Sequence, residues 1–94
     1  MHQILITPAA KKATKKLPKQ ARIAAFEASN KLKFNPHLGE KLSGSLYFLY
    51  SLHFKVSGKD YRLAYTINDK SKIIIVHLIQ IRENFYQRLK RLFR

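Results

Sequence analysis

The spacing of apolar residues changes near the middle of this chain, and this change limits the possible folds more than any other feature. In the first third, Ala21, Ala25, Ala28 and Leu32 recur at the spacing of one face of an α-helix. From Leu46 onward, apolar and polar residues alternate, as they do in strands with one buried face. Helices followed by a run of strands indicate an α+β fold.

The pattern predicts seven elements in the order strand, helix, helix, three strands and helix. Their expected ranges are residues 2–7, 9–17, 19–34, 46–56, 60–67, 73–81 and 82–94. Thr7 and Pro8 provide an N-cap and a first helical residue, because proline lacks the N–H that has no partner there. Pro18 ends the first helix and begins the second. The 94 residues are expected to form one domain, residues 1–94, with three antiparallel strands after the helical hairpin.

Ile23 and Phe26 lie beside the alanine face of the second helix. In the last helix, Phe85, Leu89 and Leu92 are expected to point inward. The strand IIIVHLIQI is apolar on both faces, so it is expected in the interior of the sheet.

The second and third predicted strands form a hairpin around a Ser-Gly turn. Two registers pair their apolar faces. A two-residue loop sets Lys55 opposite Asp60 and also pairs His53 with Arg62, whereas a four-residue loop sets Lys55 opposite Arg62. Both registers place the same four polar side chains on one face: Ser51, His53, Lys55 and Arg62. Clustered positive charge is unfavourable unless an anion binds there, although a solvated face of a basic protein gives the same pattern.

The chain is strongly basic, with 19 Lys and Arg residues, five Asp and Glu residues and a net charge of +14. Small domains normally carry a net charge of about 2 to 8, so the excess favours a polyanionic partner such as nucleic acid or the ribosome. An acidic protein is the main alternative, and a membrane is the least favoured partner. The chain lacks cysteine, a signal peptide and an apolar run of the roughly 20 residues that span a bilayer, so a cytoplasmic protein is expected.

Metal and cofactor chemistry find no support in the sequence. The four histidines lack the spacing of metal ligands, the five acids do not cluster, and there is no Gly-rich phosphate loop or nucleophile elbow. His77, in an apolar strand, is expected to be packed and hydrogen-bonded. Neither a metal nor a cofactor is expected, so any nuclease chemistry would use Arg and Lys to stabilise charge and His, Tyr or Lys to move protons.

Arg82 and Tyr86 lie where the last strand becomes the last helix, and their spacing puts both on one helix face. Either both residues belong to a functional site, or Arg82 is a surface charge and Tyr86 packs on the core. The spacing alone leaves both readings open.

Four segments resemble, in order and spacing, those of the RelE/ParE superfamily of bacterial and archaeal type II toxins, over essentially the whole chain. The segments are KKLPKQ, FNPHLGEKLSG, the hairpin LYSLHFKVSGKDYRLAY and IRENFY. The resemblance implies one of two activities. RelE-like members cleave mRNA in the ribosomal A site without a metal, by attack of a 2′-OH on the adjacent phosphate, whereas ParE-like members poison DNA gyrase. Both kinds are neutralised by an antitoxin that is usually acidic where it wraps the toxin.

The resemblance also implies residue roles. Arg62 matches the arginine that contacts the scissile phosphate, Arg82 matches an arginine at the end of the last strand, and Tyr86 matches a tyrosine that stacks on a base or transfers a proton. Ser51 and His53 stand where RelE-type enzymes carry alternating Lys or Arg residues, so His53 is the preferred general base and Tyr86 the second. Contacts with RNA are expected from seven lysines: Lys55, Lys41, Lys11, Lys12, Lys15, Lys16 and Lys19.

The leading expectation is a ribosome-dependent mRNA endonuclease that inhibits translation. One alternative is a gyrase-directed toxin without nuclease chemistry. Another is an inactive family member that only binds an antitoxin or RNA.

Overall fold

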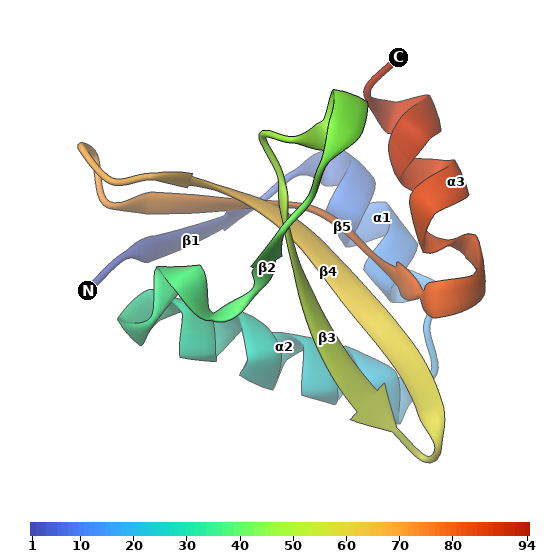
Figure 1. The fold of residues 1–94 in the computed structure, drawn as a ribbon. Coiled ribbons are helices and arrows are strands. Elements are labelled where there is room, and N and C mark those ends of the chain that lie inside the picture. Colours follow the sequence, from blue (N-terminus) through green and yellow to red (C-terminus); the bar gives the residue numbers. More distant parts are fainter.

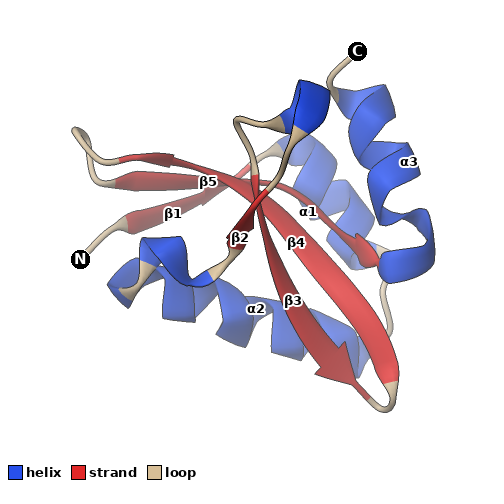
Figure 2. Cartoon of the chain, viewed as in Figure 1, coloured by secondary structure: helices blue, strands red, loops and turns tan.

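A computed structural model describes residues 1–94 and shows one five-stranded sheet with three α-helices (Figures 1 and 2). The strands are β1 (Gln3–Ile6), β2 (Glu40–Lys41), β3 (Tyr50–Val56), β4 (Lys59–Asn68) and β5 (Ile73–Ile81). The helices are α1 (Pro8–Lys15), α2 (Lys19–Phe34) and α3 (Arg82–Leu92), with short 3₁₀ turns at Pro36–Leu38 and Gly44–Leu46. The predicted α+β class and the order of the seven elements are confirmed, and β2 is an additional strand.

The strand order is β1-β5-β4-β3-β2, so β5 lies inside the sheet as its apolar pattern predicted. The three long strands pair antiparallel, whereas β1 pairs parallel with β5 and makes the sheet mixed. A parallel pair requires a crossover between its strands, and the intervening helices and hairpin provide it. β1 is one edge of the sheet, and β2 lies at the other.

The hairpin between β3 and β4 has the two-residue loop. Ser57 and Gly58 have φ angles of 51° and 79°, and a type I′ turn needs positive φ at both central residues. The resulting register sets Lys55 opposite Asp60 and His53 opposite Arg62, and it rejects the four-residue loop.

Alternation along β4 gives the sheet two different faces. We call the face that carries Tyr61, Leu63 and Tyr65 the inner face. These side chains are buried against α2, whose alanines let the helix approach the strands closely. Asp60, Arg62 and Ala64 alternate with them and point to the outer face, where Ala64 packs beneath α3.

The prediction of a strand from residue 46 is wrong at its start, because β3 begins at Tyr50. Leu46 and Leu49 instead belong to a turn, and both are buried with Phe85 and Leu89 of α3. Burial of two leucines at this spacing beneath a helix outweighs the alternation seen in the sequence.

Three apolar helix residues are solvent-exposed, and one of them, Leu92, was predicted to point inward. Leu92, the last residue of α3, is 41% exposed. Ile23 and Phe26, which lie beside the alanine face of α2, are 50% and 67% exposed.

His77 lies at an irregularity in the pairing of β4 and β5, where the register shifts between Ala64 and Tyr65. Its Nε2 lies 2.9 Å from the hydroxyl of Thr66, and its ring packs edge-on against Phe93. Partial burial lowers the pKa of His77 because it disfavours the charged imidazolium. The expectation of a packed, hydrogen-bonded histidine is confirmed. None of the helices has both the length and the apolar character needed to span a membrane.

Candidate functional site

The hairpin register brings polar residues together on the outer face of the sheet. Ser51, His53 and Lys55 of β3 lie across from Ala64, Arg62 and Asp60 of β4, respectively. The shared face that the sequence predicted for Ser51, His53, Lys55 and Arg62 is therefore present.

Arg62 has unusual surroundings for a partly buried cation. Its only hydrogen bond is a long one, from a terminal guanidinium nitrogen to the hydroxyl of Ser51 at 3.4 Å. Its Nε is buried and has no hydrogen-bond partner. No carboxylate lies within ion-pair distance of Arg62, although buried charges are normally paired. The guanidinium is thus positioned to bind an anion from outside the chain.

The nearest acid, Asp60, is engaged by other cations. Its Oδ1 lies 2.8 Å from Nε2 of His53 and 3.9 Å from Nζ of Lys55, and its Oδ2 lies 3.8 Å from a guanidinium nitrogen of Arg82. The hydrogen bond from His53 is the main cause of a lowered pKa of Asp60, so the carboxylate is charged near neutral pH. Asp60 was seen in the sequence only as a partner for Lys55, and its contact with His53 is a new feature.

The contact with Asp60 also orients the imidazole of His53. An ionised carboxylate only accepts hydrogen bonds, so Nε2 carries the proton between the two groups. In a neutral ring, Nδ1 is then the nitrogen that can accept a proton. His53 is exposed, so this nitrogen is accessible to a substrate on the outer face.

Arg62 and His53 border a cavity of about 310 Å³ at the edge of β3. The start of β2 and the last turn of α2 complete its wall, through Glu40 and Lys31. Nothing in the sequence indicates that Lys31 lies near Arg62, because its spacing is that of any exposed lysine of a helix. The cavity therefore has three basic side chains and one acid.

The segment NPHLG fixes the position of this wall. The hydroxyl of Tyr65 donates to the carbonyl of Pro36 at 2.7 Å and accepts from the N–H of Gly39 at 3.0 Å. Burial is the main reason that the pKa of Tyr65 is raised, which keeps the hydroxyl protonated. A Cβ at Gly39 would lie 2.7 Å from that hydroxyl and 2.8 Å from the carbonyl oxygen of Ser51, so only glycine fits without a shift.

Arg82 and Tyr86 occupy adjacent turns of α3, as their spacing predicted. Arg82 reaches the hairpin through Asp60, whereas Tyr86 is 43% exposed and borders a different hollow of about 500 Å³ with Lys41 and Lys90. Glu40 borders both hollows, so the two adjoin. The structure thus brings Arg82 to the Arg62 site and places Tyr86 beside it.

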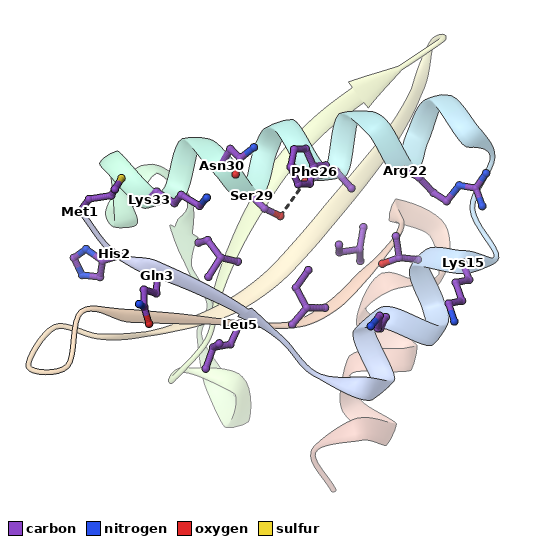
Figure 3. Close-up of a pocket in the computed structure, with 16 residues that line it drawn as sticks. Met1, His2, Gln3, Leu5, Lys15, Arg22, Phe26, Ser29, Asn30 and Lys33 are labelled. Atoms are coloured by element: carbon purple, nitrogen blue, oxygen red, sulfur yellow. Dashed lines mark hydrogen bonds between the residues drawn. The ribbon is translucent and has the colours of Figure 1, made fainter.

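The five lysines expected to bind RNA near the helical hairpin are all exposed but do not share one surface. Lys11 and Lys15 border a groove of about 700 Å³ between β1, α1 and α2 (Figure 3). Lys12 and Lys16 lie on the opposite flank of α1, in a cleft shared with α3. Lys19 borders neither hollow.

The groove in Figure 3 is apolar at its base and cationic at its rim. Leu5 and Phe26 contribute exposed apolar surface, while Arg22 and Lys33 add positive charge to that of α1. No Asp or Glu borders the groove. Elsewhere in the chain, no group of three or more His, Cys, Asp or Glu side chains is arranged to hold a metal ion.

Comparison with known proteins assigns the family. A family model described as the ParE-like toxin of type II bacterial toxin–antitoxin systems matches residues 4–90. The chain belongs to this family. No curated protein sequence matches it.

Solved structures of RelE/ParE toxins share the fold. The toxin–antitoxin complex RelBE2 from Mycobacterium tuberculosis contains a chain that is 25% identical, with a TM-score of 0.74 over 86% of this chain and 98% of that one. The RelE–RelB complex from Pyrococcus horikoshii gives 26% identity and a TM-score of 0.64, over 86% and 94% of the two chains. The isolated RelE toxin of E. coli is 21% identical, with a TM-score of 0.71 over 99% of this chain and 100% of that one. The RelE/ParE toxin superfamily predicted from the sequence is confirmed.

Proposed function

We propose that this toxin cuts mRNA on the ribosome and that Arg62 binds the scissile phosphate. The observation that carries the proposal is a partly buried guanidinium with no carboxylate partner and an unsatisfied Nε, beside an accessible imidazole. A phosphodiester would supply the missing acceptors, because guanidinium pairs with phosphate oxygens through two parallel hydrogen bonds.

The proposed chemistry follows from these positions. His53 accepts the proton of a ribose 2′-OH at Nδ1 while the 2′-oxygen bonds to the adjacent phosphorus and the bond from phosphorus to the 5′-oxygen breaks. Charge that develops on the non-bridging oxygens is stabilised by Arg62, with Arg82 and Lys55 nearby. The departing 5′-oxygen takes a proton from an acid, for which Tyr86 or a water molecule is available. No metal is needed at any step.

Tyr86 is assigned a second role as a stacking surface. Its hollow adjoins the Arg62 cavity at Glu40 and also contains Lys41 and Lys90, so an RNA strand held at Arg62 can continue toward it. Stacking of a base on an exposed tyrosine is worth about 1–3 kcal/mol.

We assign the groove in Figure 3 to the cognate antitoxin. Its apolar base and its rim of Lys11, Lys15, Arg22 and Lys33 fit an acidic amphipathic segment. Several of the similar structures are complexes of a toxin with its antitoxin, which supports a partner of this kind.

A second candidate function is inhibition of DNA gyrase, because the matching family model is that of ParE-like toxins. Such a toxin would not need the paired arrangement of His53 and Arg62. A third is an inactive protein that only binds its antitoxin or RNA.

One experiment separates these candidates. The toxin is added to a translation extract, and mRNA is mapped by primer extension while gyrase supercoiling is assayed in parallel. Wild-type toxin is expected to cut within codons of translated mRNA and to leave supercoiling unchanged, and Arg62→Ala is expected to leave mRNA intact. Inhibited supercoiling with intact mRNA would establish the gyrase function, and no effect in either assay would indicate the inactive protein.

A further inference from the structure

A lysine of α2 borders the same cavity as Arg62, although it comes from the other layer of the molecule. Lys31 lies in the last turn of α2, which covers the inner face of the sheet, whereas Arg62 and His53 belong to the outer face. The layers meet here because β2 has two residues and pairs with β3 at Tyr50 and Ser51. The edge of β3 has no strand partner beyond Ser51, and the cavity of about 310 Å³ lies along this open edge.

Lys31 has a free ammonium group. Its side chain is exposed, and no carboxylate lies within ion-pair distance of it, although Glu40 borders the same cavity. A cation near the end of a helix interacts favourably with the helix dipole, which would explain a lysine in this turn. However, Lys33 occupies the same turn and borders the groove in Figure 3 instead. The dipole therefore does not explain why Lys31 lines the Arg62 cavity.

The proposed cleavage leaves the departing 5′-oxygen in need of a proton, and the groups that bind the phosphate cannot supply it. Guanidinium groups are not deprotonated in proteins, so Arg62 and Arg82 keep their protons. His53 is the proposed base and gains a proton in the same step. The hydroxyl of Ser51 accepts a hydrogen bond from Arg62, and an alcohol is no stronger an acid than the 5′-hydroxyl that it would have to protonate. Proton donation therefore requires a further group.

Lys31 is the residue of this cavity that can donate a proton. A lysine side chain is an ammonium at neutral pH and has three N–H donors. Glutamate is ordinarily ionised at neutral pH and then only accepts hydrogen bonds, which excludes Glu40. Tyr86 borders the neighbouring hollow and not this cavity, so its ring is better placed to stack on a base than to reach the 5′-oxygen.

We propose that Lys31 is the general acid of the cleavage reaction, an inference that rests on the proposed function. As the bond from phosphorus to the 5′-oxygen breaks, one proton moves from Nζ of Lys31 to that oxygen. In the same step the 2′-oxygen bonds to phosphorus and passes its proton to Nδ1 of His53. The products are a 2′,3′-cyclic phosphate and a 5′-hydroxyl. Lys31 then regains a proton from water, because its side chain is exposed.

The separate origins of the two proton-transfer groups suit this reaction. The attacking and leaving oxygens of a phosphoryl transfer lie roughly in line, on opposite sides of the phosphorus. The base and the acid must therefore approach the phosphate from different directions. His53 comes from β3 and Lys31 from α2, and Arg62 borders the cavity between these two elements from β4.

The test compares two mRNAs in single-turnover cleavage on ribosomes saturated with toxin. One mRNA is unmodified, and the other carries sulfur in place of the 5′-bridging oxygen at the cleavage site. A thiolate departs without protonation, so a general acid is needed for the first mRNA alone. Lys31→Gln is expected to cut the unmodified mRNA at least about 100-fold more slowly than wild type. It is expected to cut the sulfur-containing mRNA at the wild-type rate.

Two matched variants separate the proton from the charge. Lys31→Arg keeps the positive charge but does not release a proton, so it should share the defect of Lys31→Gln on unmodified mRNA. His53→Gln should be slow on both mRNAs, because attack by the 2′-OH needs the base in each case. Lys70→Gln removes one charge from the turn between β4 and β5 and should cut both mRNAs as wild type does. Circular dichroism spectra check that Lys31→Gln leaves the fold intact.

Three outcomes would overturn the proposal. Wild-type cleavage of unmodified mRNA by Lys31→Gln would show that Lys31 has no part in the reaction. An equal loss on both mRNAs would show that Lys31 holds the RNA or stabilises charge and does not donate the proton. Full activity of Lys31→Arg on unmodified mRNA would lead to the same conclusion.

Failure of this proposal is distinguishable from failure of the proposed function. A wild-type toxin that cuts neither mRNA would remove the nuclease together with its acid. A wild-type toxin that cuts both mRNAs, with no selective defect in Lys31→Gln, would keep the nuclease and remove the role of Lys31.

Discussion

The two faces of β4 differ more than any other neighbouring parts of the molecule. On the inner face, Tyr61, Leu63 and Tyr65 are buried beneath α2 in a continuous apolar core. On the outer face, one residue away along the same strand, Asp60 lies among cations and Arg62 borders a cavity. The same backbone therefore serves stability on one side and, in our proposal, RNA chemistry on the other.

The difference shows how a chain of 94 residues can hold a strongly charged site. A small domain has little stability to spare, and clustered cations reduce it further. The inner face supplies a rigid platform, so that the outer face can keep an unpaired guanidinium that would otherwise be unfavourable. Substitutions on the two faces should consequently affect different measurements.

The largest expected effect on stability comes from Leu63→Ala. Leu63 is fully buried in the inner core, so removal of its side chain should lower the free energy of unfolding by about 2–5 kcal/mol. Urea unfolding of the toxin without any partner measures this change. Leu63→Met is a volume-matched control whose free energy of unfolding should fall by less than about 1.5 kcal/mol. A loss below 1 kcal/mol for Leu63→Ala would show that the inner face does not carry the stability assigned to it.

His53→Gln should reduce mRNA cleavage and leave stability nearly unchanged, the reverse of Leu63→Ala. A general base contributes about 10²–10⁴-fold to rate, so cleavage of ribosome-bound mRNA should fall at least 100-fold. The free energy of unfolding should change little, because His53 is exposed. Cleavage by His53→Gln at the wild-type rate would show that another group is the general base. Tyr86→Phe then tests the second candidate.

Gly39→Ala should affect both faces at once, because Gly39 links the cavity wall to the core through Tyr65. A Cβ there would approach the carbonyl oxygen of Ser51 at 2.8 Å, and relief of the clash should cost about 1–3 kcal/mol of stability and reduce cleavage. A double-mutant cycle with Tyr65→Phe separates the hydroxyl from the backbone as the source of the clash. If Gly39→Ala were as stable and active as wild type, the segment NPHLG would not position the cavity.

The smallest expected effect concerns acid stability. The hydrogen bond from His53 lowers the pKa of Asp60 below its ordinary value of 3.8, so Asp60 stabilises the fold above about pH 4 and loses this contribution as pH falls through its folded pKa. Asp60→Asn should therefore flatten the decline in stability below pH 4. Thermal unfolding from pH 2.5 to 7 provides the measurement, with Glu27→Gln as the control, because Glu27 is exposed and forms no ion pair. Parallel curves for Asp60→Asn and wild type would contradict the role of the Asp60–His53 contact.

Local chemistry made much of the fold predictable. Alanines at helical spacing, Pro8 and Pro18 at helix starts, and a Ser-Gly turn each act through neighbouring residues, so the order of elements could be read from the chain. The start of β3 could not be predicted in this way, because Leu46 and Leu49 are buried by α3, which lies far away in the sequence.

The candidate site was predictable to a smaller extent. Alternation placed Arg62, His53 and Lys55 on one face, since a strand allows only two faces. The contact between Asp60 and His53 depends on rotamers within that face, and Lys31 reaches the cavity through the packing of α2. Neither the Asp60–His53 contact nor the position of Lys31 follows from a spacing in the sequence.

The central claim, that Arg62 holds the scissile phosphate, is tested most directly by single-turnover cleavage of mRNA on ribosomes saturated with toxin. Saturation removes differences in docking, so the rate reports the chemical step alone. We predict that Arg62→Ala lowers this rate by about 10²–10³-fold at unchanged stability, and that Arg62→Lys restores part of it by replacing the positive charge without the bidentate geometry. An Arg62→Ala toxin that cuts ribosome-bound mRNA at the wild-type rate would contradict the account.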